Sequence, residues 1–451
     1  MSTALIILAA GKGTRMKSDQ AKVLHQIAAA PMLVHAMRAG QALEPDATVV
    51  VVGHDGEAVA SAAKAHDPGV QIARQTKQRG TAHAVAQAAP ALADHAGDAI
   101  VLYGDTPFIS QDTLLRMAEA RKSHDVVVLG FNAADPGRYG RLVMNGDTLE
   151  RITEFKDADE ATRAITFCNS GVVAASTKHL FDLIDAVGND NASGEYYLTD
   201  IVEIAREKGL GATAIACDES ETMGINSRAE LALAEAAFQA NARARALDDG
   251  VTLPAPDSVH FAFDTVIGRD AIIEQNVVFG PGVTVESGAR IRAFSHLEGC
   301  HVSRGATVGP YARLRPGTEL AEDTRIGNFV EVKNAIIDEG AKVNHLSYIG
   351  DAHLGEATNV GAGTITCNYD GVMKHHTEVG RNAFIGSNTM LVAPVSVGDD
   401  AMTASGSVIT RNVPDGALAI ARAAQENKPG FARKLFEMLK KKKLKRDERA
   451  G

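Results

Sequence analysis

A glycine-rich loop with two cationic side chains stands close to the start of the chain. Residues 4–18 read ALIILAAGKGTRMKS, an apolar run that leads into a glycine loop containing Lys12 and Arg15. Glycine lets a backbone approach phosphate oxygens closely, and the two cations add charge beside them. The spacing fits no dinucleotide fingerprint, since Met16 replaces the third glycine, and it fits no P-loop. The loop therefore predicts an anion-binding turn, with a plain strand-to-helix turn as the alternative.

The segments that must position this loop follow an α/β pattern. From residue 4 to about 226, the apolar runs ALIILAA, ATVVVVGH, DAIVLYGD and DVVVLGF alternate with helical stretches. This alternation is typical of a largely parallel sheet covered by helices on both faces. Ligands of such sheets bind where the strands end. Because the glycine loop and Gly104–Asp105 both follow predicted strands, we expect them on one edge of the sheet.

A long helix is predicted over residues 227–250. Ser227 and Glu230 form a capping box, and Gly250 stands where a C-terminal cap is expected. A helix of roughly 22 residues is about 33 Å long, enough to separate two domains. Its apolar stripe is marked by Leu231, Ala234 and Phe238.

Beyond this helix the apolar period becomes six, which neither a helix nor an alternating strand produces. A hexapeptide repeat does, with one inward apolar residue on each face of a triangular, left-handed parallel β-helix. The stretch Ile365–Val379 breaks the rhythm, so a loop is expected to project there. The series consists of Ile267, Ile273, Phe279, Val285, Ile291, Leu297, Val302, Val308, Leu314, Leu320, Ile326, Val332, Ile337, Val343, Ile349, Leu354, Val360, Val379, Ile385, Leu391 and Val397.

Composition indicates a soluble protein of two or three domains. The chain has 451 residues, 23% of them charged and 45% hydrophobic, with no apolar stretch long enough to cross a bilayer and no signal peptide. We therefore expect a cytoplasmic protein without integral membrane association. Four scattered cysteines, without a C-x-x-C pair, argue against disulfides and a zinc site. They are Cys168, Cys217, Cys300 and Cys367.

Net charge gives no reason to expect nucleic acid as a partner, since it is -10. The segment KKKKLKR, residues 440–446, is the exception and could attract anionic lipid, RNA or phosphate. A solvated, disordered tail is the commoner reading of such a segment and the one we favour.

The ordered set of motifs resembles one bacterial family over nearly the whole chain. LAAGKGTRM, YGDTP, CNSG, GEYYLTD, GINSR, ARLRPG, GNFVEVKN and GAGTITCNYDG occur in the order found in the bifunctional N-acetylglucosamine-1-phosphate uridylyltransferases and glucosamine-1-phosphate acetyltransferases. The resemblance implies a Rossmann-like uridylyltransferase domain at 1–228, a helical linker at 229–249 and an acetyltransferase β-helix at 250–451 that ends in the basic tail.

In the first domain the resemblance implies transfer of UMP from UTP to N-acetylglucosamine-1-phosphate, with Mg²⁺ as cofactor. Asp105 and Asn226 match the magnesium ligands, and such oxygen donors suit that ion. Arg15 and Lys22 would neutralise charge on the α-phosphate. Ala21 departs from the proline usual in the family, which loosens the segment carrying Lys22. The nucleotide and its uracil would contact Leu8, Ala9, Ala10, Gly11, Lys12, Gly13, Thr14, Gln75, Gly80, Thr81, Tyr103 and Gly104; the sugar side is matched by Gly140, Glu154, Asn169, Tyr197 and Thr199.

In the second domain the resemblance implies acetyl transfer from acetyl-CoA to glucosamine-1-phosphate. His345 matches the general base, since an amine must lose a proton as it is acylated. Glu331 is a candidate for orienting His345. The sugar phosphate would contact Arg315, Lys333, Tyr348, Asn359, Asn368 and Tyr369, the last two also counted with the coenzyme site; acetyl-CoA would contact Ala362, Ser387, Ser405 and Arg422.

Enzymes of this β-helix type are typically homotrimers, so the loop Asn368–Asp370 is expected to complete a neighbour's site. His375 and His376, further along that loop, are expected to be solvated rather than metal ligands. Two alternatives stand beside this reading. One is another sugar-1-phosphate nucleotidyltransferase, such as a glucose-1-phosphate adenylyltransferase, whose β-helix is structural. The other is an inactive regulatory subunit that keeps the β-helix for assembly.

Overall fold

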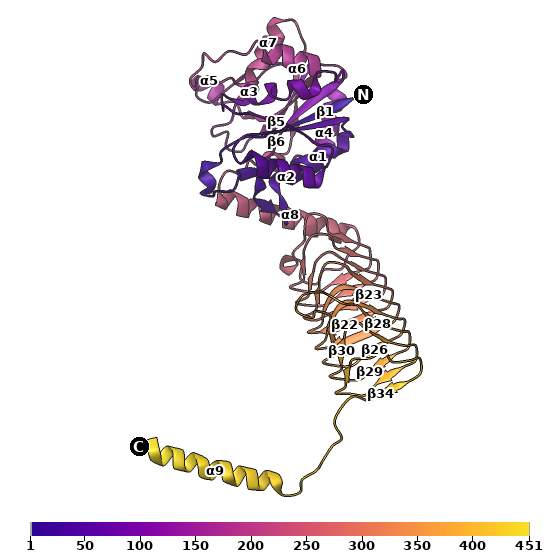
Figure 1. Ribbon diagram of the computed structural model, residues 1–451. Helices are drawn as coiled ribbons and strands as arrows, with labels where there is room; N and C mark the ends of the chain where they lie inside the picture. The colour runs from indigo at the N-terminus through magenta and orange to yellow at the C-terminus, as the bar shows by residue number, and fades with distance from the viewer. Residues whose placement is uncertain (1, 451) are drawn as a thin grey trace. The chain divides into compact units, whose positions relative to one another are not determined.

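The computed structural model describes residues 2–450, which fall into two compact units (Figure 1). The first unit ends at Arg245 and also takes in Phe261–Phe263. The second holds Ala246–His260 and the chain from Asp264 onward.

The first unit is built on a mixed sheet whose strands run in the order β11-β7-β10-β6-β1-β4-β5. The central strand β1 pairs parallel with β4 and β6, and every residue of β1 is buried. The four strands predicted from sequence are present. Strand β10 is antiparallel to both β6 and β7, so the sheet is largely but not wholly parallel. The strands are β1 (Thr3–Ala9), β4 (Ala47–Val52), β5 (Gln71–Arg74), β6 (Asp98–Tyr103), β7 (Val126–Asn132), β10 (Phe167–Ser176) and β11 (Ala212–Cys217), with a hairpin of β8 (Arg141–Asn145) and β9 (Thr148–Thr153) beside β10 and a small ribbon of β2 (Gln26–Ile27) and β3 (Ala30–Pro31).

Helices cover both faces of this sheet, as predicted (Figure 1). Alternate residues of β1 point to opposite faces, Ile6 into one core with α3, α6 and α7, and Ile7 into the other with α1, α2 and α4. The helices are α1 (Met32–Gly40), α2 (Gly56–His66), α3 (Thr81–Ala86), α4 (Gln111–Ala120), α5 (Glu160–Arg163), α6 (Thr177–Ile184) and α7 (Ile201–Glu207), with short 3-10 turns η1 (Thr14–Met16), η2 (Lys22–Leu24), η3 (Gln41–Leu43), η4 (Ala89–Leu92), η5 (Leu198–Asp200) and η6 (Glu219–Thr222).

The long helix α8 spans Arg228–Asp248. Its N–H at Glu230 donates to the Ser227 hydroxyl at 3.3 Å, one half of the predicted capping box. The other half differs, because the Glu230 carboxylate accepts from Asn226 rather than from Ser227. The predicted apolar stripe packs against the first unit, with Ala234 fully buried. Gly250 follows the helix with φ +85°, which confirms the predicted glycine stop.

The second unit is a parallel β-helix of short strands (Figure 1). The 3-10 turn η7 (Pro256–Ser258) precedes its first strand. Every strand pair in it is parallel, and paired residues lie about 17–18 positions apart along most of the chain. One sheet contains β13 (Ile272–Ile273), β16 (Arg290–Ile291), β19 (Thr307–Val308), β22 (Arg325–Asn328), β24 (Lys342–His345), β26 (Asn359–Val360), β29 (Phe384–Ile385), β32 (Met402–Thr403) and β34 (Leu418–Ala419). The others are β12 (Val266–Ile267), β14 (Val278–Phe279), β15 (Thr284–Val285), β17 (His296–Leu297), β18 (Cys300–Val302), β20 (Arg313–Leu314), β21 (Thr318–Leu320), β23 (Glu331–Ile337), β25 (Tyr348–Leu354), β27 (Ile365–Cys367), β28 (Thr377–Val379), β30 (Met390–Val392), β31 (Val395–Val397) and β33 (Val408–Ile409).

The period-six residues form the core of this β-helix. Each position of the predicted series from Ile273 to Val397 is buried, whereas Ile267 at the open first coil is half-buried. The predicted break in the rhythm is also present, as a loop between β27 and β28. The hexapeptide prediction is therefore confirmed.

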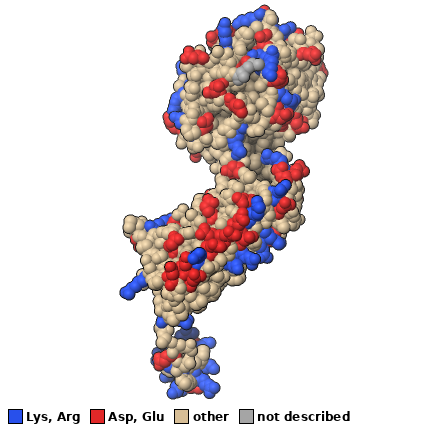
Figure 2. Space-filling view, turned by 90° about the vertical axis from the view of Figure 1, so that its right-hand side faces the viewer, with Lys and Arg blue, Asp and Glu red and all other residues tan. Residues whose placement is uncertain are grey.

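We expected the basic tail to be disordered because of its charge, but this prediction is wrong. The tail lies in the helix α9 (Phe431–Ala450), whose side chains are exposed and whose Lys and Arg residues show as blue atoms in Figure 2. Lysine, leucine, methionine, glutamate and alanine are good helix formers, and here that propensity outweighs repulsion among neighbouring lysines. None of the described helices is both long enough and apolar enough to span a membrane.

Candidate functional sites

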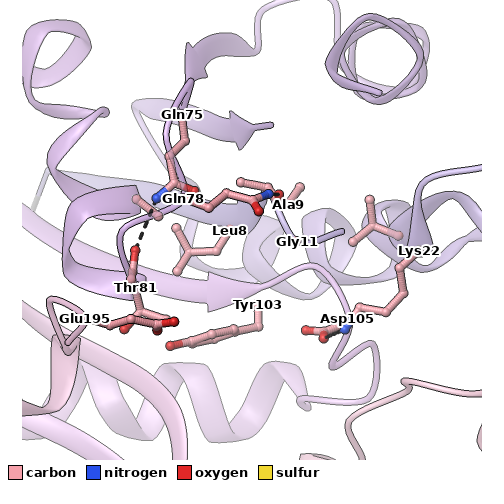
Figure 3. Close-up of a pocket in the computed structure, with 14 residues that line it drawn as sticks. Leu8, Ala9, Gly11, Lys22, Gln75, Gln78, Thr81, Tyr103, Asp105 and Glu195 are labelled. Atoms are coloured by element: carbon pink, nitrogen blue, oxygen red, sulfur yellow. Dashed lines mark hydrogen bonds and ion pairs between the residues drawn. The ribbon is translucent and has the colours of Figure 1, made fainter. Parts of the chain in front are cut away.

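The glycine loop and Asp105 lie close together in the first unit, because each follows one of two neighbouring parallel strands. Strands β1 and β6 are parallel, and the N–H of Gly104 donates to the Leu8 carbonyl at 2.9 Å. A cavity of about 320 Å³ opens beside them (Figure 3). Its lining includes ten residues expected at the nucleotide site: Leu8, Ala9, Ala10, Gly11, Lys22, Gln75, Gly80, Thr81, Tyr103 and Asp105.

Lys22 connects the two residues expected to bind magnesium. Its Nζ forms an ion pair with the Asp105 carboxylate and donates to Asn226 Oδ1 at 2.9 Å. The N–H of Ile225 donates to the Asp105 carbonyl at 3.0 Å, so the backbone also fixes these two segments together. An aspartate oxygen and an amide oxygen therefore converge on one cationic point at the cavity wall. Such a donor set fits Mg²⁺, which binds few protein oxygens and keeps water and phosphates as further ligands.

The glycine loop packs closely against the Lys22 side chain. Gly13 has φ +58°, and a Cβ there would lie 2.5 Å from the Lys22 Cβ, so only glycine fits. The expected ligand residues Lys12, Thr14 and Arg15 are exposed and do not line the cavity.

Ala21, the departure from the family pattern, is buried just before Lys22. Its φ of -55° is one that proline also adopts, so the backbone keeps the course a proline would impose. Its N–H lies 3.5 Å from Asp55 Oδ2, a weak hydrogen bond that proline could not make.

The segment expected to recognise uracil is held against the loop before α7. Gly80 has φ +117°, and a Cβ there would lie 2.4 Å from the Tyr196 carbonyl oxygen. Gln75 is buried, and its Nε2 donates to the Gly80 carbonyl at 3.1 Å, drawn as a dashed line in Figure 3. Thr81 accepts from the N–H of Leu198 at 2.9 Å.

The residues expected on the sugar side form a second group beyond Tyr103. Asn169 donates its N–H to the Gly140 carbonyl at 2.9 Å, and Glu154 accepts from the Thr199 hydroxyl at 3.3 Å. Burial raises the pKa of Glu154, an effect that the Thr199 hydrogen bond partly opposes. Tyr197 precedes the turn η5 that carries Thr199.

Tyr103 stands between the two groups, since it lines the large cavity and also a small one shared with Asn169 and Thr199. Burial, followed by the charges of Asp105 and Glu154, raises its pKa, so the phenol stays protonated.

Sequence reasoning missed four residues of the cavity wall, the apolar Val23 and Ala84 and the polar Gln78 and Glu195. Gln78 donates its Nε2 to the Ala10 carbonyl at 2.6 Å, which ties the uracil segment to the glycine loop. Glu195 lines the opposite side (Figure 3). Glu195 belongs to the motif GEYYLTD but was given no role there, and Gln78 belongs to none of the quoted motifs, so only the fold places both in the cavity wall.

In the second unit, the residues expected to bind acetyl-CoA follow one corner of the β-helix. Gly363 donates its N–H to the His345 carbonyl at 3.2 Å, Asn388 to Ala362 at 2.7 Å, and Gly406 to Ser387 at 2.8 Å. The Arg422 guanidinium donates to the Ser405 carbonyl at 2.9 Å. Four expected coenzyme residues and His345 thus occupy successive coils, in a line that suits an extended ligand.

His345 is exposed at the end of β24, and its Nδ1 lies 2.9 Å from Asn328 Oδ1. The expectation that Glu331 orients His345 is wrong. Glu331 instead forms an ion pair with Arg315 at 2.8 Å and lies 3.8 Å from Arg313. Two arginines outcompete a histidine for the same carboxylate.

Two of the residues expected to bind the sugar phosphate, Arg315 and Lys333, form a positive cluster with Lys374. A contact with Lys374, burial and the charge of Lys374 lower the pKa of Lys333, while Asp351 opposes the shift. Arg315 adds a third positive charge nearby. Lys374 was missed from the sequence because only the folded loop brings it beside Lys333.

The loop residue Asn368 is buried, where its amide contacts the Asp351 carboxylate and, at 3.5 Å, the Tyr348 hydroxyl. The Tyr348 ring lies over Gly350, at which any Cβ would be 2.4 Å from the hydroxyl oxygen. Asn359 is half-buried on β26. Tyr369 is 59% exposed, so it is a residue that the loop offers outward.

Comparison with known proteins assigns the two units. Residues 5–179 match the MobA-like NTP transferase domain, and residues 264–299 and 376–411 match the bacterial transferase hexapeptide repeat. The chain is 70% identical to the Bifunctional protein GlmU of Ruegeria sp. (strain TM1040), an alignment that covers 98% of this chain and 99% of the relative. It is 64% identical to that of Jannaschia sp. (strain CCS1), over 97% of this chain and 96% of the relative.

The chain belongs to the GlmU family. It is accordingly a bifunctional uridylyltransferase and acetyltransferase that makes UDP-N-acetylglucosamine for the cell wall. This excludes both alternatives, because a GlmU protein has two activities and its β-helix is catalytic. UTP and acetyl-CoA are its two donor substrates.

Proposed function

We propose that uridylyl transfer occurs at the cavity beside Lys22, Asp105 and Asn226. The observation that carries the proposal is the convergence of the Asp105 and Asn226 oxygens on the Lys22 ammonium. Mg²⁺ held by those two oxygens would supply positive charge to the triphosphate and to the pyrophosphate that leaves. An oxygen of N-acetylglucosamine-1-phosphate attacks the α-phosphorus of UTP as the bond to the β-phosphate oxygen breaks.

The chain's own residues orient this reaction. The loop Gly11–Gly13 brings backbone close to the phosphates, while Lys22 and the exposed Arg15 neutralise charge on the α-phosphate. Gln75, Gly80 and Thr81 present the uracil-binding edge. On the far side of Tyr103, Glu154 and Asn169 hold the sugar.

Acetyl transfer takes place at the corner of the β-helix marked by His345. The amine of glucosamine-1-phosphate attacks the thioester carbonyl, the C–S bond breaks, and His345 accepts the proton that the amine loses. The thiolate of CoA leaves and takes up a proton. Arg315, Lys333 and Lys374 hold the sugar phosphate, which is why three cations gather there against one another's repulsion.

The acetyltransferase assembles as a homotrimer. One observation that supports this is a stack of exposed aromatic rings on successive coils of the β-helix. The ring centroids of Phe294 and Tyr311 are 4.9 Å apart, and those of Tyr311 and Phe329 are 5.3 Å apart. These three rings are 47–56% exposed. Apolar rings aligned along one edge favour burial against a second copy. The projecting loop, with Tyr369 exposed, would complete the neighbour's site. A monomer by light scattering at working concentration would contradict this assembly.

The experiment that tests the whole scheme is product analysis by mass spectrometry. The protein is incubated with UTP, magnesium, acetyl-CoA and glucosamine-1-phosphate, and then with each donor or the metal left out. UDP-N-acetylglucosamine should form only in the complete mixture. N-acetylglucosamine-1-phosphate should accumulate when UTP or the metal is absent. Formation of the nucleotide sugar at full rate with chelator present would show that the Asp105–Asn226 assignment is wrong. We further propose that the enzyme acts in the cytoplasm.

A further inference from the structure

Strands β22 and β24 place Asn328 directly beside His345. The two strands are parallel neighbours, and Asn328 is the register partner of His345 one coil below. Their side chains meet with Asn328 Oδ1 2.9 Å from His345 Nδ1. The backbone reinforces the pairing, because the N–H of Leu346 donates to the Asn328 carbonyl at 3.0 Å.

This contact bears on which ring nitrogen of His345 can accept a proton. A neutral imidazole carries hydrogen on one nitrogen and a lone pair on the other. An amide oxygen can only accept, so a hydrogen bond to Asn328 Oδ1 requires the hydrogen on Nδ1. The lone pair is then on Nε2, the nitrogen that faces away from Asn328.

We propose that Asn328 is the positioning residue for His345, holding it in the tautomer whose Nε2 takes the proton from the substrate amine. The proposal rests on the proposed role of His345 as the base. Glu331 does not fill this position, because its carboxylate is engaged by Arg315 and Arg313.

The pair lies in the wall of a cavity that charged side chains also line. Asn328 and His345 share the wall of a cavity of about 410 Å³ with Asn344 and two cations, Arg292 and Arg325. These arginines are the Lys or Arg side chains among the residues that line this cavity. A neutral amide partner fits such a site, since it fixes the tautomer without stabilising the imidazolium as a carboxylate would.

The test compares three variants of the full-length protein: Asn328→Ala, Asn328→Asp and the control Asn344→Ala. Asn344 lies in the same cavity wall, next to His345 in sequence, so its removal tests for general disturbance. Acetylation kcat, the KM for acetyl-CoA and the pH–rate profile are measured, with uridylyl transfer in the same sample as a check on the folded state.

Asn328→Ala should lower acetylation kcat by about 10- to 100-fold, the usual loss when an outer partner that fixes a histidine is removed, and leave the acetyl-CoA KM within about twofold. Asn328→Asp keeps the acceptor and adds negative charge, so the acid limb of its pH–rate profile should move to higher pH by roughly one unit. Asn344→Ala should stay within about threefold of the unmodified enzyme, and uridylyl transfer should be unchanged throughout.

The proposal is overturned if Asn328→Ala keeps kcat within about threefold, or if Asn328→Asp leaves the acid limb in place. An equal loss in Asn344→Ala would also overturn it, because the effect would then not be specific to the tautomer. His345→Ala separates this failure from failure of the proposed base. Should that variant acetylate at a near-normal rate, the role of His345 itself is wrong; should it be inactive while Asn328→Ala is normal, only the positioning role is wrong.

Discussion

The carboxylate of Glu230 accepts a hydrogen bond at 2.6 Å from the backbone N–H of Asn226. This contact joins the first turn of α8 to one of the two proposed magnesium ligands. Glu230 thus holds Asn226 by its backbone, while the Asn226 side chain accepts a hydrogen bond from Lys22 through Oδ1.

Removing that hold should weaken the metal site without abolishing it. We expect Glu230→Ala to raise the magnesium concentration for half-maximal uridylyl transfer about tenfold, as loss of an outer-shell partner commonly does. Glu230→Gln should restore much of the affinity, because its amide oxygen still accepts. Ser227→Ala is the matched control: it removes the other half of the cap but keeps the Asn226 contact. Equal magnesium dependence in the Ser227 and Glu230 alanine variants would refute the idea.

The two activities should be separable, because their residues lie in different units. Asp105→Ala is expected to lower uridylyl transfer by about three orders of magnitude or more, since it deletes the carboxylate that pairs with Lys22. Acetylation should be unaffected. Asp112→Ala, which removes an exposed ion pair with Arg116, should change neither rate. A parallel fall of acetylation in folded Asp105→Ala would mean that the sites are not independent.

Asp200, at the end of η5, should destabilise the first unit at neutral pH. Burial, followed by the charges of Glu154, Glu203 and Asp157, raises its pKa to about 6. The folded state therefore binds a proton that the unfolded state has already lost between about pH 4 and 6, so stability falls as pH rises through that window. We expect Asp200→Asn to raise the unfolding midpoint by about 1–3 °C at pH 7.5, with the gain disappearing towards pH 4. Calorimetry at both pH values checks this, and a gain that persists at pH 4 would point to another cause.

His353 should stabilise the second unit, and more strongly at low pH than at high pH. Burial alone would lower its pKa, but Asp338 and Glu378, hydrogen-bonded to its two ring nitrogens at 2.8 and 2.6 Å, raise it. A raised histidine pKa stabilises the fold at pH values below the unfolded pKa, and this stabilisation is lost as pH rises through the folded one.

Replacing His353 with asparagine should therefore lower the unfolding midpoint of the second unit by about 1–2 °C at pH 6 and by less at pH 8.5; the side chain is one-third exposed, which limits the effect. The same substitution at the exposed His296 is the control for general disturbance, and it should lower the midpoint by less than about 1 °C at pH 6. A deficit for His353→Asn that is the same at both pH values would contradict the linkage.

Much of this architecture could be predicted from local patterns. The period of six predicted the inward residues from Ile273 to Val397, because each coil repeats one spacing. Asp105 was predicted as a site residue because it directly follows a predicted strand. Strand β10 escaped notice as an antiparallel insertion, since direction is set by connections and not by composition. The helical tail was misjudged because charge was given more weight than helix propensity.

Within the sites, what could not be predicted is contact across coils. Asn328 and His345 are 17 residues apart, a distance that has no meaning until the register of β22 and β24 is known. Glu331 was assigned to the wrong partner for the same reason, since Arg315 lies one coil away, just after the adjoining strand β20. Lys374 reaches Lys333 only through the folded loop.

The contact between Lys22 and Asn226 joins residues 204 positions apart. Asn226 follows every strand of the first sheet, and Glu230, which holds it, belongs to the helix after that. On the ribosome, a nascent chain therefore exposes its glycine loop, Lys22 and Asp105 long before Asn226 emerges. The proposed uridylyltransferase site is thus completed late in the synthesis of its unit: a chain cut short before Asn226 contains every residue that lines the nucleotide cavity but lacks the Asn226 oxygen that Lys22 contacts. The site is therefore complete before the unit itself, which continues through α8 to Arg245 and takes in Phe261–Phe263.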